Sequence, residues 1–164
     1  MATDTTFEAT AIPAWRAWVF SWRGVLLVTL LAAIGVSGYL SYVKATDVAM
    51  VCTSGGAFDC GTVQNSVYSE IFGVPIAWLG LGWNFLILGT LLFEDRLPIL
   101  QTYGLALLFG LVTFGFLYSV YLVYLQAFVI EAFCQWCLMH EALYTVLMIA
   151  IGVRVWGMLR GTAA

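Results

Sequence analysis

Four cysteines are the residues of this chain whose type and spacing can do chemistry. Cys52 and Cys60 stand in "CTSGGAFDCG", a segment rich in glycine and serine, and Cys134 and Cys137 form the CxxC motif "CQWC". Thiols at such spacings serve as structural disulfides, as metal ligands or as redox centres. The CxxC motif alone leaves these three alternatives open, so the elements that position the cysteines have to separate them.

The spacing of each pair bears on its chemistry. Cys134 and Cys137 are three residues apart, which puts both on one face of a helix, close enough to bridge at its first turn. A helix N-terminus favours the thiolate, and a lowered pKa suits a thiol for exchange. Cys52 and Cys60 would close a loop of only eight residues, whereas long loops gain most from a disulfide in the entropic model. This short pairing suits a shuttle better than a staple.

Composition indicates that the solvent of this chain is largely lipid. Of its 164 residues, 63% are hydrophobic and 9% are charged, and the mean hydropathy is +0.98. No soluble domain of this size could bury so much apolar surface. The net charge of −3 offers no basic surface for nucleic acid. The sequence therefore predicts an integral membrane protein.

Four apolar runs are long enough to cross a bilayer as helices, which takes about 20 residues each. They cover approximately residues 25–42, 74–93, 99–126 and 133–156. Between the second and third runs, "EDRLP" predicts a charged turn whose Pro98 opens the next helix. Only Gln126 and Glu131 mark the link from the third run to the fourth. We expect an all-α bundle of four transmembrane helices.

The cationic residues give this bundle a direction. Four crossings put five arginines on one side of the membrane and leave Lys44 on the other. The five are Arg16, Arg23, Arg96, Arg154 and Arg160. Cytoplasmic loops carry the excess of Lys and Arg, so both termini are expected in the cytoplasm and the loop 43–73 outside an inner or plasma membrane. The chain then divides into a cytoplasmic segment 1–22, a membrane domain 23–156 and a cytoplasmic tail 157–164.

With this orientation all four cysteines lie on or just below the external face. That compartment is oxidising, so disulfides can form there. One pair can meet soluble proteins and the other can meet a molecule dissolved in the bilayer, which favours an electron relay. We also expect residues 62–70 to form a short amphipathic helix over the site, with Val63, Val67 and Ile71 on one face.

This arrangement resembles the vitamin K epoxide reductase family. The resemblance rests on the loop pair Cys52 and Cys60, on Ser66 six residues later, and on the "CQWC" that opens the fourth run. It covers about residues 25–156. Many microbial members carry a fused thioredoxin-like domain. The printed chain has none, so we expect a separate thioredoxin-like partner in the periplasm or lumen.

The resemblance implies a helix bundle around a quinone of the menaquinone, ubiquinone or vitamin K type, with no metal. By analogy, the partner's thiolate would attack Cys52, Cys60 would then attack Cys134, and Cys137 would reduce the quinone. Ser66 matches a serine that is expected to shape or polarise the active pair.

Three further polar residues are candidates for supporting the quinone site: Glu141, His140 and Asn84. Vertebrate members contact the quinone with an asparagine early in the second span and a tyrosine one turn after the CxxC. Here those positions fall on Ile76 or Ala77 and on Glu141, so epoxide reduction and warfarin sensitivity do not follow from the resemblance. Glu141 is an ionisable residue within a span, either a proton donor or a hydrogen-bonded packing residue.

Two rival classes remain for the sequence. The first is a thiolate metal site, which Asp59 and His140 could join. The second is a non-enzymatic membrane protein with two structural disulfides. Mixed disulfides with a partner protein would distinguish the relay from both.

Overall fold

The computed structural model describes residues 22–53, 55 and 57–161. Its four long helices are α2 (Trp22–Thr46), α4 (Ile76–Phe93), α5 (Pro98–Leu125) and α6 (Gln135–Leu159). All four are long and apolar enough to cross a membrane, which confirms the predicted spans. Most of the predicted cytoplasmic segment, with Arg16, and residues 162–164 of the predicted tail lie outside the described residues.

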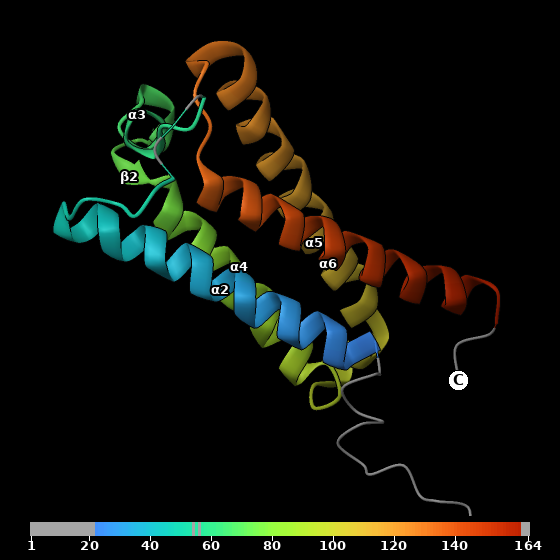
Figure 1. Cartoon of the computed structure of the whole chain (residues 1–164). Coiled ribbons are helices and arrows are strands. Elements are labelled where there is room, and N and C mark those ends of the chain that lie inside the picture. Colours follow the sequence, from blue (N-terminus) through green and yellow to red (C-terminus); the bar gives the residue numbers. More distant parts are fainter. Residues whose placement is uncertain (1–21, 54, 56, 162–164) are drawn as a thin grey trace, which may run out of the picture.

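The long helices form a bundle in which α6 packs against both α2 and α5, and α4 packs against α2 and α5 (Figure 1). Its core is apolar, with Leu30 and Leu147 almost fully buried. Helices α5 and α6 approach closely at Gly115, where an added side chain would collide with the ring of Tyr144. The bundle therefore closes around side chains contributed by all four helices.

The turn between α4 and α5 is held by ion pairs at one end of the bundle. Arg154 on α6 donates to both carboxylate oxygens of Glu94, at 3.1 and 2.5 Å, and Arg23 on α2 donates to Asp95 at 2.5 Å. Glu94 is only 7% exposed, and a buried carboxylate requires such a partner. Pro98 is in the first turn of α5, as the "EDRLP" motif predicted.

The link from α5 to α6 has a shape that the sequence did not indicate. Helix α5 continues into a π-helical turn, η2 (Gln126–Ile130), which ends where Glu131 adopts a left-handed conformation with φ 55°. This turn reverses the chain and places the start of α6 beside the loop that follows α2.

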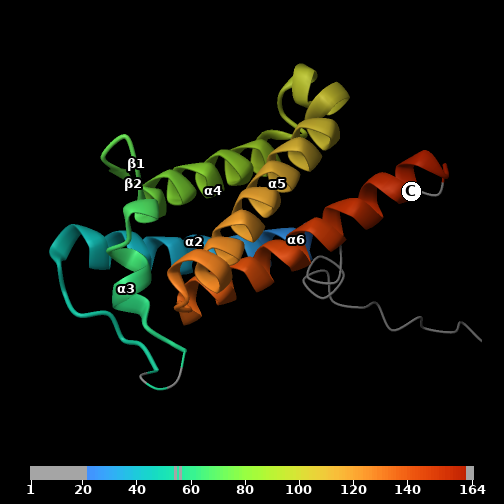
Figure 2. The same cartoon turned by 90° about the horizontal axis from the view of Figure 1, so that it is seen from above.

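That loop contains α3 (Cys60–Gln64), the 3₁₀ turn η1 (Val67–Ser69) and the short strands β1 (Glu70–Ile71) and β2 (Val74–Pro75). The strands pair antiparallel around a two-residue turn, Phe72–Gly73, in which both residues have positive φ. Figure 2 shows these elements gathered at the end of the bundle where α2 finishes, which we call the cysteine end.

The predicted single amphipathic helix over residues 62–70 is wrong in its bounds. The helix begins earlier because Asp59 caps it, accepting from the Thr62 N–H at 3.0 Å. It ends at Gln64 because Ser66 is extended and its hydroxyl donates to the Val63 carbonyl at 2.8 Å. Val63 is consequently buried, whereas Val67 is 86% exposed.

Candidate redox site

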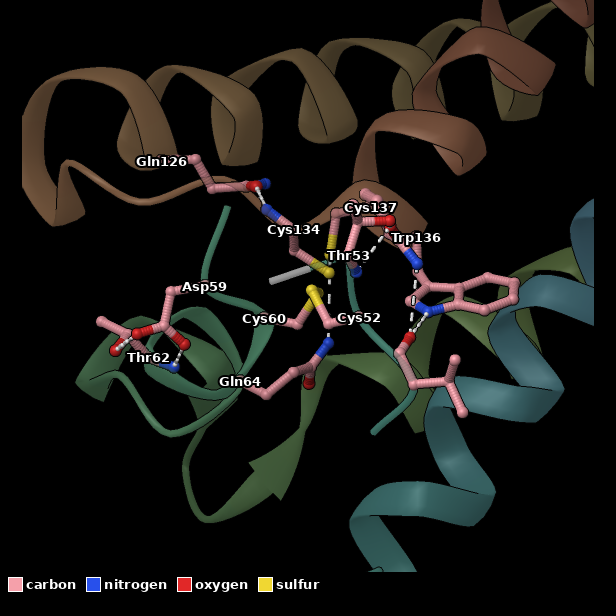
Figure 3. Close-up of a disulfide and its surroundings, with 12 residues drawn as sticks. Cys52, Thr53, Asp59, Cys60, Thr62, Gln64, Gln126, Cys134, Trp136 and Cys137 are labelled. Carbon is pink, nitrogen blue, oxygen red and sulfur yellow. Dashed lines mark hydrogen bonds between the residues drawn. A yellow bond between two sulfur atoms is a disulfide. The ribbon is translucent and has the colours of Figure 1, made fainter. Parts of the chain in front are cut away.

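All four cysteines lie together at the cysteine end. Cys52 and Cys60 form a disulfide with their Cα atoms 6.1 Å apart, and Cys134 and Cys137 are thiols. Cys60 and Cys134 are 1% and 0% exposed and belong to one buried cluster, against which the half-buried Cys52 and Cys137 pack. Figure 3 shows the sulfur atoms of both pairs meeting between the loop and the start of α6.

Backbone hydrogen bonds bring Cys60 to Cys134. The Asp59 N–H donates to the Phe133 carbonyl at 3.1 Å, and the Phe133 N–H donates to the Ala57 carbonyl at 2.8 Å. These bonds form a parallel bridge between Phe58, two residues before Cys60, and Phe133, the residue before Cys134. The two sequence-distant cysteine pairs are therefore joined by the same interactions that fold the loop.

The two residues between the CxxC cysteines hold the segment that carries Cys52. Gln135 accepts from the N–H and the hydroxyl of Thr53, at 3.1 and 2.7 Å, and donates to the Val51 carbonyl at 3.3 Å. The Trp136 indole N–H donates to the same carbonyl at 2.7 Å, and its ring packs on Tyr39. The "QW" inside the motif thus clamps the Cys52 segment onto the CxxC.

We expect Trp136→Phe to slow thiol exchange between the two cysteine pairs about fivefold. The phenylalanine ring keeps the contact with Tyr39 but removes the indole N–H, and one hydrogen bond is worth about 1 kcal/mol. The measurement is the single-turnover rate at which reduced Cys52 and Cys60 reduce an oxidised CxxC. Trp78→Phe is the matched control, because it removes an indole hydrogen bond to Ser41 away from the cysteines. Equal rates in the two variants would contradict the clamp.

Cys134 is the N-cap residue of α6. The pKa of its thiol is lowered from 9.0 to about 7. The main cause is a hydrogen bond from the Cys137 thiol; backbone N–H groups of Cys137 and Trp136 also lower this pKa, while burial opposes them. Cys134 is therefore the residue of the reduced CxxC that holds the thiolate.

This assignment predicts a pH dependence for the reduced CxxC. As the pH rises through about 7, Cys134 should lose its proton and the thiolate absorbance near 240 nm should increase. A variant lacking Cys52 and Cys60 would isolate this signal. Adding Cys137→Ala should move the midpoint upward towards 9.0, because the main cause of the shift is gone. A midpoint that stays near 7 without Cys137 would contradict this account.

Gln126 belongs to the site, although the sequence analysis did not predict it as a site residue. It is 2% exposed, and its side-chain oxygen accepts the Cys134 N–H at 2.8 Å (Figure 3). The backbone carbonyl of Gln126 accepts the Ala132 N–H at 3.2 Å. Gln126 thus holds the start of the π turn against the segment that follows it. An amide at the end of a long apolar run is the signal in the sequence that could have indicated this role.

A mainly apolar cavity of about 300 Å³ opens beside Cys137. It lies among α2, α4, α5, α6 and the loop, and its walls include Leu40, Val63, Trp83, Phe114 and Leu122. Ile76 and Ala77 also line it. Gln64 on α3 lines it too and places its amide nitrogen 3.9 Å from the Cys137 sulfur. This volume is at the small end of the usual range for ligand pockets.

The supporting residues predicted from the sequence fall into two groups. His140 lines the cavity, and Asn84 lies behind it, fully buried and hydrogen-bonded to His140. Ser66 and Glu141 are not among the lining residues. Ser66 ends α3, and Glu141 bonds to Ser119 while its Oε2 atom is buried without a partner among the described residues.

Within the described part of the chain, no group of three or more His, Cys, Asp and Glu side chains is placed to hold a metal ion. Asp59 is engaged in capping α3, and His140 faces Asn84.

The sequence match to known proteins agrees with this geometry. Residues 12–151 match the model of the vitamin K epoxide reductase family. The chain belongs to this family. A similar protein is the thiol-disulfide oxidoreductase LTO1 of Arabidopsis thaliana, 33% identical over 112 residues, which are 65% of this chain and 30% of LTO1. The match thus spans less than a third of that relative's length. Family membership and the four long apolar helices identify an integral membrane protein.

Proposed function

We propose that the protein is a membrane thiol oxidoreductase that takes electrons from a thioredoxin-like partner and passes them to a membrane quinone. The observation that carries this proposal is the joint burial of Cys60 and Cys134 in one cluster, with Cys137 on the apolar cavity behind them. Membership of the family, and the similarity to the thiol-disulfide oxidoreductase LTO1, support thiol-disulfide chemistry.

The first exchange takes place at Cys52. Cys60 is buried and Cys52 is half-buried, so a partner thiolate reaches Cys52 more readily. Attack breaks the Cys52–Cys60 bond and releases the Cys60 thiolate. The partner's second thiol then displaces Cys52, which leaves the partner oxidised and the loop pair reduced.

The second exchange moves these two electrons to the CxxC. Cys60 attacks Cys134 in an oxidised CxxC and releases Cys137, whose sulfur lies near the Gln64 amide. Cys52 then displaces Cys134 from Cys60 and restores the loop disulfide.

The last step is reduction of the quinone. The two CxxC sulfurs become a disulfide and pass two electrons to a quinone in the cavity. The Cys137 thiol gives one proton and water gives the second where Cys134 is a thiolate, which completes the quinol. The mostly apolar walls suit the ring and tail of such a molecule. Ser66 and Glu141 would act from outside the lining residues, Ser66 by ending α3 and Glu141 through Ser119.

The proposed orientation places the cysteine end outside the cytoplasm. An impermeant maleimide should then label Cys52 from outside in reduced, intact cells or spheroplasts, because Cys52 is half-buried on the loop. A variant with cysteine only at position 52 gives the cleanest signal, and a Cys52→Ala variant of that chain is the blank. Labelling of Cys52 solely after the cytoplasm is opened would reverse the orientation.

The experiment that tests the function uses the purified full chain in lipid nanodiscs. A reduced thioredoxin-like protein and a short-chain ubiquinone or menaquinone are added, and quinone loss is followed by absorbance. We expect one partner disulfide to form for each quinone reduced. Partner oxidation without quinone consumption, or no oxidation with either quinone type, would overturn the proposal.

A further inference from the structure

A cluster of four hydrogen-bonded polar side chains lies at the inner wall of the cavity. It joins Ser37 on α2, Asn84 on α4, and His140 and Tyr144 on α6. The Asn84 side-chain nitrogen lies 3.1 Å from the Ser37 hydroxyl and 3.3 Å from His140 Nε2, and the Tyr144 hydroxyl lies 2.5 Å from the Asn84 oxygen. Ser37, His140 and Tyr144 line the cavity, whereas Asn84 does not.

The neighbours of Asn84 determine which way its amide faces. The Ser37 hydroxyl donates to the Ala33 carbonyl at 2.9 Å, so its oxygen is left as an acceptor. Because the Ser37 oxygen accepts, the NH₂ group of Asn84 must face it. The Asn84 oxygen then faces Tyr144 and accepts from its hydroxyl. The amide orientation is thus fixed on both sides.

This orientation determines the tautomer of His140. One hydrogen of the Asn84 amide points to Ser37, and the other points to His140 Nε2. A nitrogen that accepts a hydrogen bond carries no proton, so the proton of the neutral imidazole is on Nδ1. Asn84 is a positioning residue that acts through His140.

The Nδ1–H group is available to a ligand. Among the described residues it has no hydrogen-bond partner. Nδ1 is also accessible. In that part of the chain, Glu141 Oε2 is the one side-chain nitrogen or oxygen that is both buried and without a partner, so Nδ1, which has no partner, is not buried. His140 lines the cavity three residues after Cys137.

We propose that His140, held as the Nδ1–H tautomer by Asn84, donates a hydrogen bond to a carbonyl oxygen of the quinone reduced by Cys137. This inference rests on the proposed function and names the polar contact of its substrate. Negative charge develops on that oxygen as electrons arrive, and a fixed donor stabilises it in a water-poor site. Cys137 supplies one proton of the quinol and water supplies the second where Cys134 is already a thiolate, so His140 stays neutral throughout.

Nitrogen-15 NMR tests the tautomer directly, because the chain has one histidine. The full chain is labelled with ¹⁵N-histidine and purified through a tag without histidine. We expect a protonated Nδ1 and an unprotonated Nε2, with the Nδ1 signal shifting when a short-chain quinone is added. In Asn84→Asp the carboxylate accepts instead of donating, so the proton should move to Nε2. A wild-type Nε2–H tautomer, or an Nδ1 signal unmoved by saturating quinone, would overturn the proposal.

Two substitutions of His140 distinguish the roles of its two ring nitrogens. Asparagine can place its NH₂ where histidine has Nδ1, whereas glutamine reaches only the Nε2 position, where its amide oxygen accepts from the Asn84 NH₂ group. We expect His140→Asn to keep the KM for quinone within about twofold of wild type and His140→Gln to raise it about fivefold, the effect of one hydrogen bond. Equal KM values in the two variants would contradict the assignment.

The readouts also keep this inference separate from the proposed function. Electron transfer from the loop pair to the CxxC should be unchanged in both variants, because it does not involve quinone. If the wild-type protein reduces no quinone, the proposed function fails. If the wild type is active and both variants match it in KM, only the role of His140 fails. A thermal melt of each variant excludes loss of the fold as the cause.

Discussion

Replacing Cys137 with alanine is expected to abolish quinone-dependent thiol oxidation, by about a thousandfold or more, as for loss of a nucleophile in other enzymes. Cys137 lies on the cavity, and without it the CxxC cannot form the disulfide that delivers two electrons. Cys134→Ala should fail to the same extent. The measurement is the loss of quinone absorbance in nanodiscs with a reduced protein partner.

The loop cysteines give the matched comparison. Cys52→Ala and Cys60→Ala should lose oxidation of the protein partner to a similar degree. With dithiothreitol as reductant they should keep activity within about tenfold of wild type, because a small thiol can reach the CxxC directly. If the loop variants lose both activities equally, the two pairs do not act in series.

The membrane spans could be predicted from the sequence because lipid imposes a simple requirement. Each crossing needs an unbroken apolar run, and α2, α4, α5 and α6 follow the four runs closely. The cysteine pairs were also visible, since reactive thiols are rare and their spacing is informative. Both features are local in the sequence.

The contacts that join the cysteine pairs are not local. Gln135 and Trp136 bind Thr53 and Val51 across more than 80 residues, through a few side-chain hydrogen bonds that leave no periodic pattern. Gln126 reaches Cys134 because a π turn reverses the chain there. The break after Gln64 depends on an extended Ser66, which hydrophobic periodicity cannot reveal. Such contacts emerge when the whole bundle is assembled.

The disulfide that links the two cysteine pairs during electron transfer is expected to accumulate when the cysteines that resolve it are removed. Removing Cys52 and Cys137 together leaves Cys60 and Cys134, with no thiol in the chain to resolve a bond between them. Both are almost fully buried in the same cluster, and the Asp59–Phe133 backbone bond holds the residues that precede them. Mild oxidation of the Cys52→Ala/Cys137→Ala chain should therefore form an internal Cys60–Cys134 disulfide in most molecules.

The matched control is Cys60→Ala/Cys137→Ala, which leaves Cys52 with Cys134. The clamp from Gln135 and Trp136 holds Thr53 and Val51 rather than Cys52 itself, and Cys52 is only half-buried. This pair should cross-link more slowly than Cys60 with Cys134. Peptide mapping by mass spectrometry after blocking free thiols measures both bonds. If Cys60 and Cys134 stay reduced while the control cross-links, electrons enter the CxxC through Cys52, and the assigned order of the loop cysteines is reversed.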